Sequence, residues 1–220
     1  MKQLAIRIFY IALGQLVFAL GIVLMIKANI GYAPWEVFHV GLAYTTGLSI
    51  GLVSIIIGII IIAIVTAFGE KIGFGTILSM VLCGVFIDLI MLTGFVSTAE
   101  SFAAGIIMLL IGLLLVAYGS YLYMKTGLGA GPRDNLMVVL NRKTRLPVGV
   151  CRSAVEVLVT LAGWLLGGMV GIGTIISAIA VGFFIQFVFA IFKFDVAAVQ
   201  HETLQETAKL LLGNHFNKLR

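Results

Sequence analysis

Charged side chains inside long apolar stretches are the first residues of this sequence that could do chemistry. Arg152, Glu156 and Asp88 each lie in a stretch of about 20 mostly apolar residues. A charge inside a bilayer is costly, so such residues usually mark a substrate site, a proton path or an ion pair. Glu156 follows Arg152 by four residues, so the two form either a structural pair or part of a site. Gln15 and Tyr118, in other apolar stretches, complete the candidates for substrate binding or coupling.

A ten-residue motif that occurs twice, at 27–36 and 125–134, is the second candidate. In each copy a Lys ends a hydrophobic helix, a Gly-rich turn follows, and a new helix begins at Pro with an acid two residues later. The acid either only complements the helix dipole, or the exposed amides form an anion-accepting site near the Lys. The two copies would then be symmetric gates or halves of one site. The motif residues are Lys27, Gly31, Pro34, Trp35, Glu36, Lys125, Gly129, Pro132, Arg133 and Asp134.

Both motif copies belong to a longer internal duplication. Adding 98 to a residue number in the first half gives its counterpart in the second, without a gap from about 5 to 87. The best-matched stretch is 73–79 against 171–177. Small residues near a helix start favour capping and the close approach of another helix, so helix packing is expected here. The packing residues are Gly75, Thr76, Ser79, Gly173, Thr174 and Ser177.

Membrane-spanning helices are the elements that must position these residues. The 220-residue chain is 61% hydrophobic and only 10% charged, which is typical of an integral membrane protein. Segments 34–46 and 132–145 are too short to span and too apolar for plain loops, so they are predicted to be half-helices or interfacial helices. His39 is expected at the interface, and Ser97 to Glu100 has the pattern of a capping box. The six predicted spans are 4–26, 50–68, 74–93, 102–124, 147–166 and 173–192.

Three spans in each repeat give the two repeats opposite orientations, because three is odd. With a cytoplasmic N-terminus, all of the 14 Lys and Arg residues except Lys27 fall on or near the cytoplasmic side. The expected fold is therefore an all-α integral membrane protein with six transmembrane helices in two inverted three-helix repeats. Repeat 1 covers 1–98, repeat 2 covers 99–195, and 196–220 is a cytoplasmic C-terminal tail.

Other functional classes leave no signature in the sequence. Cys83 and Cys151 have neither metal nor disulfide spacing, and no hydrolase or nucleotide-binding motif occurs. The net charge of +5 is explained by the cytoplasmic loops, so nucleic-acid binding is not expected. We expect no enzyme activity, cofactor or metal. The expected partners are the lipid bilayer, a small-molecule or anionic substrate, and a second copy in a homodimer or a cytoplasmic protein.

The motifs resemble those of the YczE/YitT group of bacterial multi-pass membrane proteins. Residues 31–37, 47–51 and 73–76, with Asp88 in the following span, are similar to the patterns typical of that group. The second copy departs from them at Arg133, in place of Trp, and at Gln186, in place of the acid. We expect the YczE-like branch, because YitT proteins commonly carry a soluble C-terminal domain and we expect none in this sequence. The resemblance implies the cytoplasmic membrane of a bacterium and brings no settled substrate.

Two functions fit these observations. The repeat, the broken connections at Pro34 and Pro132, and the charges inside spans favour a small secondary transporter or permease with its site between the repeats. The alternative is an accessory or regulatory membrane protein that transports nothing and acts through a cytoplasmic partner.

Overall fold

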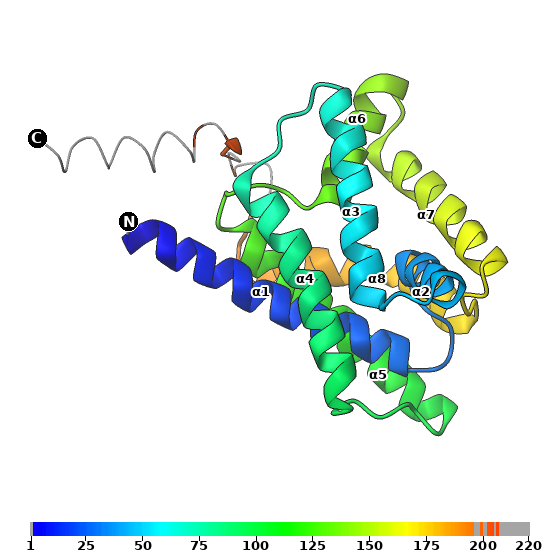
Figure 1. The fold of residues 1–220 in the computed structure, drawn as a ribbon. Coiled ribbons are helices and arrows are strands. Elements are labelled where there is room, and N and C mark those ends of the chain that lie inside the picture. The colour runs from blue at the N-terminus through cyan, green and yellow to red at the C-terminus, as the bar shows by residue number, and fades with distance from the viewer. Residues whose placement is uncertain (1, 196–198, 200–201, 205, 207–220) are drawn as a thin grey trace, which may run out of the picture.

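Eight α-helices form the fold (Figure 1) of this computed structural model, which describes residues 2–195, 199, 202–204 and 206. Within these residues there is no strand. Six of the helices (α1, α3, α4, α5, α7 and α8) are long and apolar enough to cross a membrane, as predicted. Most of the tail at 196–220 lies outside the described residues. The helices are α1 Lys2–Lys27, α2 Pro34–Thr46, α3 Ile50–Ala67, α4 Phe74–Thr93, α5 Phe102–Met124, α6 Pro132–Thr144, α7 Val148–Leu165 and α8 Ile172–Ile191.

The helix boundaries follow local signals in the sequence. Helices α2 and α6 both begin at Pro, whose fixed φ suits the first helical position. Helix α2 ends at Gly47, which takes the left-handed conformation with φ of 72°. Helix α5 is capped by Ser101, whose hydroxyl accepts a hydrogen bond from the Ala104 amide. The capping box predicted at Ser97 to Glu100 is therefore wrong, because the helix starts one residue after Ser101.

The helices of the two halves match in length and place along the chain. The bounds of α2, α3 and α4 differ from those of α6, α7 and α8 by 98 at every start and every end. The glycines that open α4 and α8 lie against turns of the opposite half: Gly75 N donates to Leu128 O at 2.8 Å, and Gly173 N donates to Ile30 O at 2.8 Å. The residue numbers in these two contacts also differ by 98, both for the donors and for the acceptors.

Helices α1 and α5 pack against each other at the centre of the molecule (Figure 1). Glycines allow the two backbones to approach closely. A methyl group added to Gly21 would lie 2.6 Å from Gly112 O, and one added to Gly119 would lie 2.7 Å from Gly14 O. Gly14 and Gly112 are counterparts, as are Gly21 and Gly119, so the 98-residue relation exchanges one contact for the other.

The contact between α3 and α4 has no counterpart between α7 and α8. Gly51 lies directly against the backbone of Gly84, whose own added methyl would lie 2.5 Å from Gly51 O. Asp88 caps α3 from α4, because its carboxylate accepts from Gly51 N at 2.8 Å and from Ser49 Oγ at 2.5 Å.

At the counterparts Gly149 and Gly182, nothing within the described residues lies closer than 4 Å to an added methyl. Helices α3 and α4 are thus joined at a point where α7 and α8 are not.

This difference predicts opposite outcomes for two matched substitutions. Gly51→Ala should destabilise the protein by about 1–3 kcal/mol, because the new methyl overlaps the backbone of Gly84 and the Asp88 carboxylate. Gly149→Ala, in open space at the same position of α7, should cost nothing and gain a few tenths of a kcal/mol from helix propensity. Melting temperatures in detergent measure both, and equal temperatures would contradict the α3–α4 contact.

Candidate functional site

A cavity of about 190 Å³ lies between the two halves of the chain. All eight helices contribute to its wall. Twenty-six of its thirty lining residues form thirteen pairs whose numbers differ by 98, among them Glu36 with Asp134 and Ser79 with Ser177. The two halves therefore turn corresponding faces toward one shared space.

The N-terminal ends of α2 and α6 meet at this cavity, where Pro34 and Pro132 form part of its wall. The residues before them, Ala33 and Gly131, offer no side-chain cap to the first turn. The amides at a helix start have no partner within the helix, and they carry the positive end of its dipole. Both copies of the repeated motif thus bring a positive helix end to the same place.

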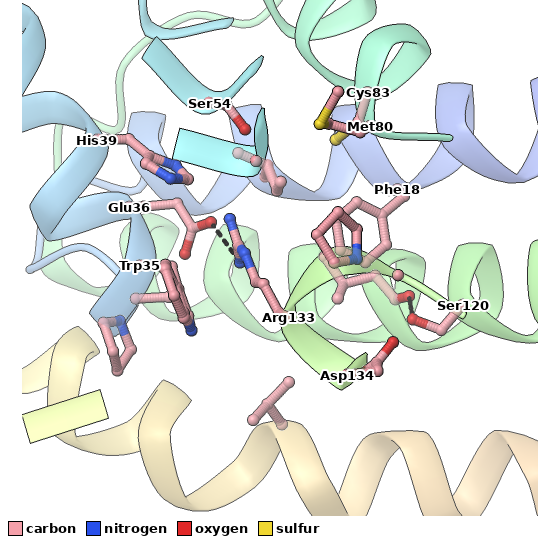
Figure 2. A pocket seen from close by; sticks show the side chains of 18 of the residues that line it. Phe18, Trp35, Glu36, His39, Ser54, Met80, Cys83, Ser120, Arg133 and Asp134 are labelled. Atoms are coloured by element: carbon pink, nitrogen blue, oxygen red, sulfur yellow. Dashed lines mark hydrogen bonds and ion pairs between the residues drawn. The ribbon is translucent and has the colours of Figure 1, made fainter. Parts of the chain in front are cut away.

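Glu36, Trp35 and Arg133 form the centre of the site (Figure 2). Arg133 Nη1 lies 3.6 Å from Glu36 Oε1, which is an ion pair but too long for a hydrogen bond. The guanidinium carbon of Arg133 lies 4.6 Å from the centre of the Trp35 ring, within the range of a cation–π contact. Trp35 and Arg133 are counterparts in the duplication, so equivalent positions with different side chains meet here.

Burial controls the ionisation of the groups carried by the two short helices. It raises the pKa of Glu36, and the nearby Arg133 charge offsets only part of that effect. Burial also raises the pKa of Asp134, although the hydrogen bond of 3.1 Å from the Tyr123 hydroxyl opposes it. Burial and then the Arg133 charge lower the pKa of His39 well below its ordinary value, so its imidazole is neutral at pH 7.

Of the other polar side chains that line the cavity, some are hydrogen-bonded to each other and some have no hydrogen-bond partner among the described residues. Arg152 Nε donates to Glu156 Oε1 at 2.9 Å, the ion pair that the four-residue spacing suggests. Gln15 is only 4% exposed and His39 only 3% exposed, and neither has a hydrogen bond to any residue that the structure describes. A buried polar group without a partner is costly, so these two groups are candidates for ligand contact.

Four of the charged or aromatic residues singled out from the sequence lie outside the cavity wall. Asp88 caps α3, as described above. Tyr118 packs on Phe192, with ring centres 5.6 Å apart. Lys125 Nζ lies 3.9 Å from the centre of the Tyr10 ring, and the Lys27 carbonyl accepts a hydrogen bond from Ala99.

The small residues of the motifs shape the turns around the site. Gly31 and Gly129 have φ of 111° and 137°, a conformation that favours glycine. Thr76 Oγ1 donates to Ala130 O at 2.6 Å, and Thr174 Oγ1 accepts from Gly171 N at 3.1 Å. Ser79 lines the cavity together with its counterpart Ser177.

Several lining residues were missed or misplaced by the sequence argument. His39 was expected at the interface and instead lies in the cavity beside Trp35. Tyr123, Ser120 and Met137 also line the cavity and were not identified as site residues. The duplication relates them to Met25, Ile22 and His39, which also line the cavity, but neither Met25 nor Ile22 was singled out in the sequence, so only Met137 could have been found through its counterpart.

Together, the fold and this cavity define a multi-pass α-helical membrane protein with a cavity between its helices that is lined by both charged and apolar side chains. Residues 5–190 match the family of unknown function DUF6198, and the chain belongs to this family.

Three relatives cover most of the chain. It is 39% identical over 191 residues to the uncharacterized membrane protein YczE of Bacillus subtilis (strain 168). The matched region covers 84% of this chain and 86% of YczE. It is 34% identical to an uncharacterized protein of Haemophilus influenzae, over 81% of this chain and 83% of that relative. It is 27% identical to the uncharacterized protein YyaS of Bacillus subtilis, over 78% of this chain and 86% of YyaS. No solved structure matches the chain. The YczE-like resemblance of the sequence motifs is confirmed.

Proposed function

We propose that the protein is a small secondary transporter or permease whose substrate site is the cavity between its two halves. The observation that carries this proposal is the meeting of the α2 and α6 helix starts at one cavity with charged side chains. Secondary transporters commonly place their sites at such broken helices between repeats. The long ion pair between buried Glu36 and half-buried Arg133 also suits a site that changes partners during a cycle.

The two halves are proposed to be inverted repeats in the cytoplasmic membrane of a bacterium, with both termini in the cytoplasm. Each half has three long apolar helices, and an odd number reverses the direction of the second half. Contacts that the 98-residue relation exchanges, such as Gly21 with Gly112 and Gly14 with Gly119, are what a two-fold relation between the halves would produce. The basic residues at the α6–α7 end of the molecule agree with this orientation.

In this orientation the α3–α4 contact closes the extracytoplasmic side. Gly51 and Asp88 lie toward the outer ends of α3 and α4, whereas Gly149 lies toward the inner end of α7 and does not touch Gly182. The protein would therefore be in an inward-facing state. A difference of this kind between two repeats is what an alternating-access mechanism requires.

Flux into proteoliposomes tests the proposal. The purified full chain should take up at least one solute from a panel of small organic acids, amines and neutral solutes under an imposed pH gradient. Arg133→Gln, reconstituted at the same density, should reduce that flux at least about tenfold. If no solute enters faster than into protein-free vesicles, the transport proposal is wrong. That result would favour the non-transporting accessory or regulatory role through a cytoplasmic partner.

A further inference from the structure

We propose that the cavity binds a small organic monocarboxylate, whose carboxylate pairs with Arg133 and whose apolar part fills the space beside α1 and α5. The inference rests on the proposed function only in treating the cavity as the substrate site. It names the chemical class of the ligand and the residue that recognises it.

The balance of hydrogen-bond donors and acceptors in the cavity points to an anion. Two of its three carboxylates already accept hydrogen bonds: Tyr123 donates to Asp134, and Arg152 donates to Glu156. Arg133 carries five N–H donors, yet within the described residues it makes no hydrogen bond, and its ion pair to Glu36 spans 3.6 Å. The five N–H donors of Arg133 therefore outnumber the two oxygens of Glu36, the one carboxylate of the cavity that accepts no hydrogen bond among the described residues.

Further donors surround Arg133. Gln15 and His39 are both more than nine-tenths buried, line the cavity and have no hydrogen-bond partner among the described residues. The neutral His39 ring and the Gln15 amide each offer an N–H group to a ligand. The starts of α2 and α6 add their positive dipole ends.

The shape of the site favours a planar carboxylate over other anions. The Trp35 ring packs against one face of the planar Arg133 guanidinium. The edge of the guanidinium is then available for a bidentate contact with a carboxylate. A phosphate would bring a second negative charge close to Glu36, Asp134 and Glu156, which all line the same cavity.

The size and walls of the cavity favour a ligand with an apolar part. Its volume of about 190 Å³ corresponds to roughly six water molecules, and it is smaller than a pocket for a drug-sized ligand. Phe18, Leu113 and Val116 provide apolar wall on the α1–α5 side. A small inorganic anion would leave this wall uncovered, whereas a compact hydrocarbon ring would bury it.

The two tryptophans of the chain supply a direct assay. Trp35 lies under Arg133, whereas Trp164 is 57% exposed, so Trp164→Phe leaves one reporter inside the cavity. The purified Trp164→Phe protein is titrated with cyclohexanecarboxylate, which does not absorb where tryptophan fluoresces. Cyclohexanecarboxamide has the same shape without the charge, and acetate has the charge without the ring.

A saturable change in Trp35 fluorescence is expected with cyclohexanecarboxylate at concentrations at which the amide and acetate have little effect. Arg133→Gln should raise the Kd at least tenfold, about 1.4 kcal/mol. Arg142→Gln, an exposed arginine on the same helix, should leave the Kd unchanged. An equal response to acid and amide, or a Kd unaffected by Arg133→Gln, would overturn the proposal. The comparison of acid with amide needs no change at Arg133, so it holds even if that variant does not fold.

The same ligand separates this inference from the proposed function. If cyclohexanecarboxylate binds as expected but no solute is transported, the carboxylate site stands and the transport proposal fails. If other solutes are transported while the acid and the amide bind alike, transport stands and the carboxylate inference fails.

Discussion

Glu36→Gln should remove most of the pH dependence of cyclohexanecarboxylate binding and give tight binding at neutral pH. Glu36 and the ligand compete for Arg133, because the Glu36 carboxylate is the only acidic group that the structure pairs with that arginine among the described residues. Two opposite charges at this distance attract each other by several kcal/mol at the effective dielectric constant of a protein, and desolvation offsets part of that attraction. Removing the competing charge should therefore tighten binding roughly 10- to 100-fold above the pKa of Glu36.

The direction of the pH effect follows from the raised pKa of Glu36. Below that pKa the carboxyl is neutral, Arg133 has no counter-charge, and the ligand anion binds tightly. As the pH rises through that pKa, Glu36 becomes charged, pairs with Arg133 and weakens ligand binding. In the native protein affinity should therefore fall with rising pH, whereas in Glu36→Gln it should stay high.

The other groups that face Glu36 are Arg133 on α6, Glu156 on α7, Cys83 on α4 and His39 on α2 itself. Arg133 forms the ion pair with Glu36, and Glu156 accepts a hydrogen bond from Arg152. Burial keeps the pKa of His39 well below its ordinary value, so its ring is neutral at pH 7.

Fluorescence titrations in the Trp164→Phe background, from about pH 5.5 to about pH 8, measure this effect, because the ligand carboxyl is ionised throughout that range. Asp134→Asn is the matched control, since Asp134 is the counterpart of Glu36 and burial raises its pKa too. It should leave the pH profile of binding in place. A profile unchanged in Glu36→Gln, or removed by Asp134→Asn instead, would show that Glu36 is not the group that competes.

Helix limits could be predicted closely because the signals that set them are local. Pro34 can only begin a helix, and Gly47 takes the left-handed conformation that ends one, so segment 34–46 was bounded from sequence. The duplication indicated a matching segment at 132–145, one residue longer than the helix that ends at Thr144. There Arg145 replaces glycine and still adopts a positive φ of 59°, which residue type alone would not indicate.

The site could be predicted only in part because its contacts join residues far apart in the chain. The sequence marked Glu36 and Arg133 as motif residues, but an offset of 98 says nothing about the distance between the two copies. Asp88 was a candidate because a carboxylate in an apolar stretch is costly. Its hydrogen bonds to Ser49 and Gly51 meet that cost through helix capping, which one sequence cannot distinguish from ligand binding.

A disulfide between Gly149→Cys and Gly182→Cys should abolish transport, and reduction should restore it. In an inverted repeat the two halves exchange their arrangements during the cycle. The contact now made by Gly51 and Gly84 would then form at Gly149 and Gly182 in the outward-facing state. A disulfide requires the two Cα atoms within about 7 Å, so it can form only when α7 and α8 close together.

The experiment starts from a protein in which Cys83 and Cys151 are replaced by alanine and which retains its flux. Mild oxidation in membranes should cross-link the Gly149→Cys/Gly182→Cys protein, shift its mobility in a non-reducing gel and reduce flux to the level of protein-free vesicles. Either cysteine alone, oxidised in the same way, should keep full flux.

The cross-linked state should also separate α3 from α4, because both helix pairs cannot be closed around a cavity that has to open on one side. The substitution Ser49→Cys, beside the Asp88 cap, should therefore give a thiol that reacts faster with a maleimide after cross-linking. If the two cysteines react with maleimide but never form a disulfide, or if flux continues once they have, α7 and α8 do not repeat the closure of α3 and α4.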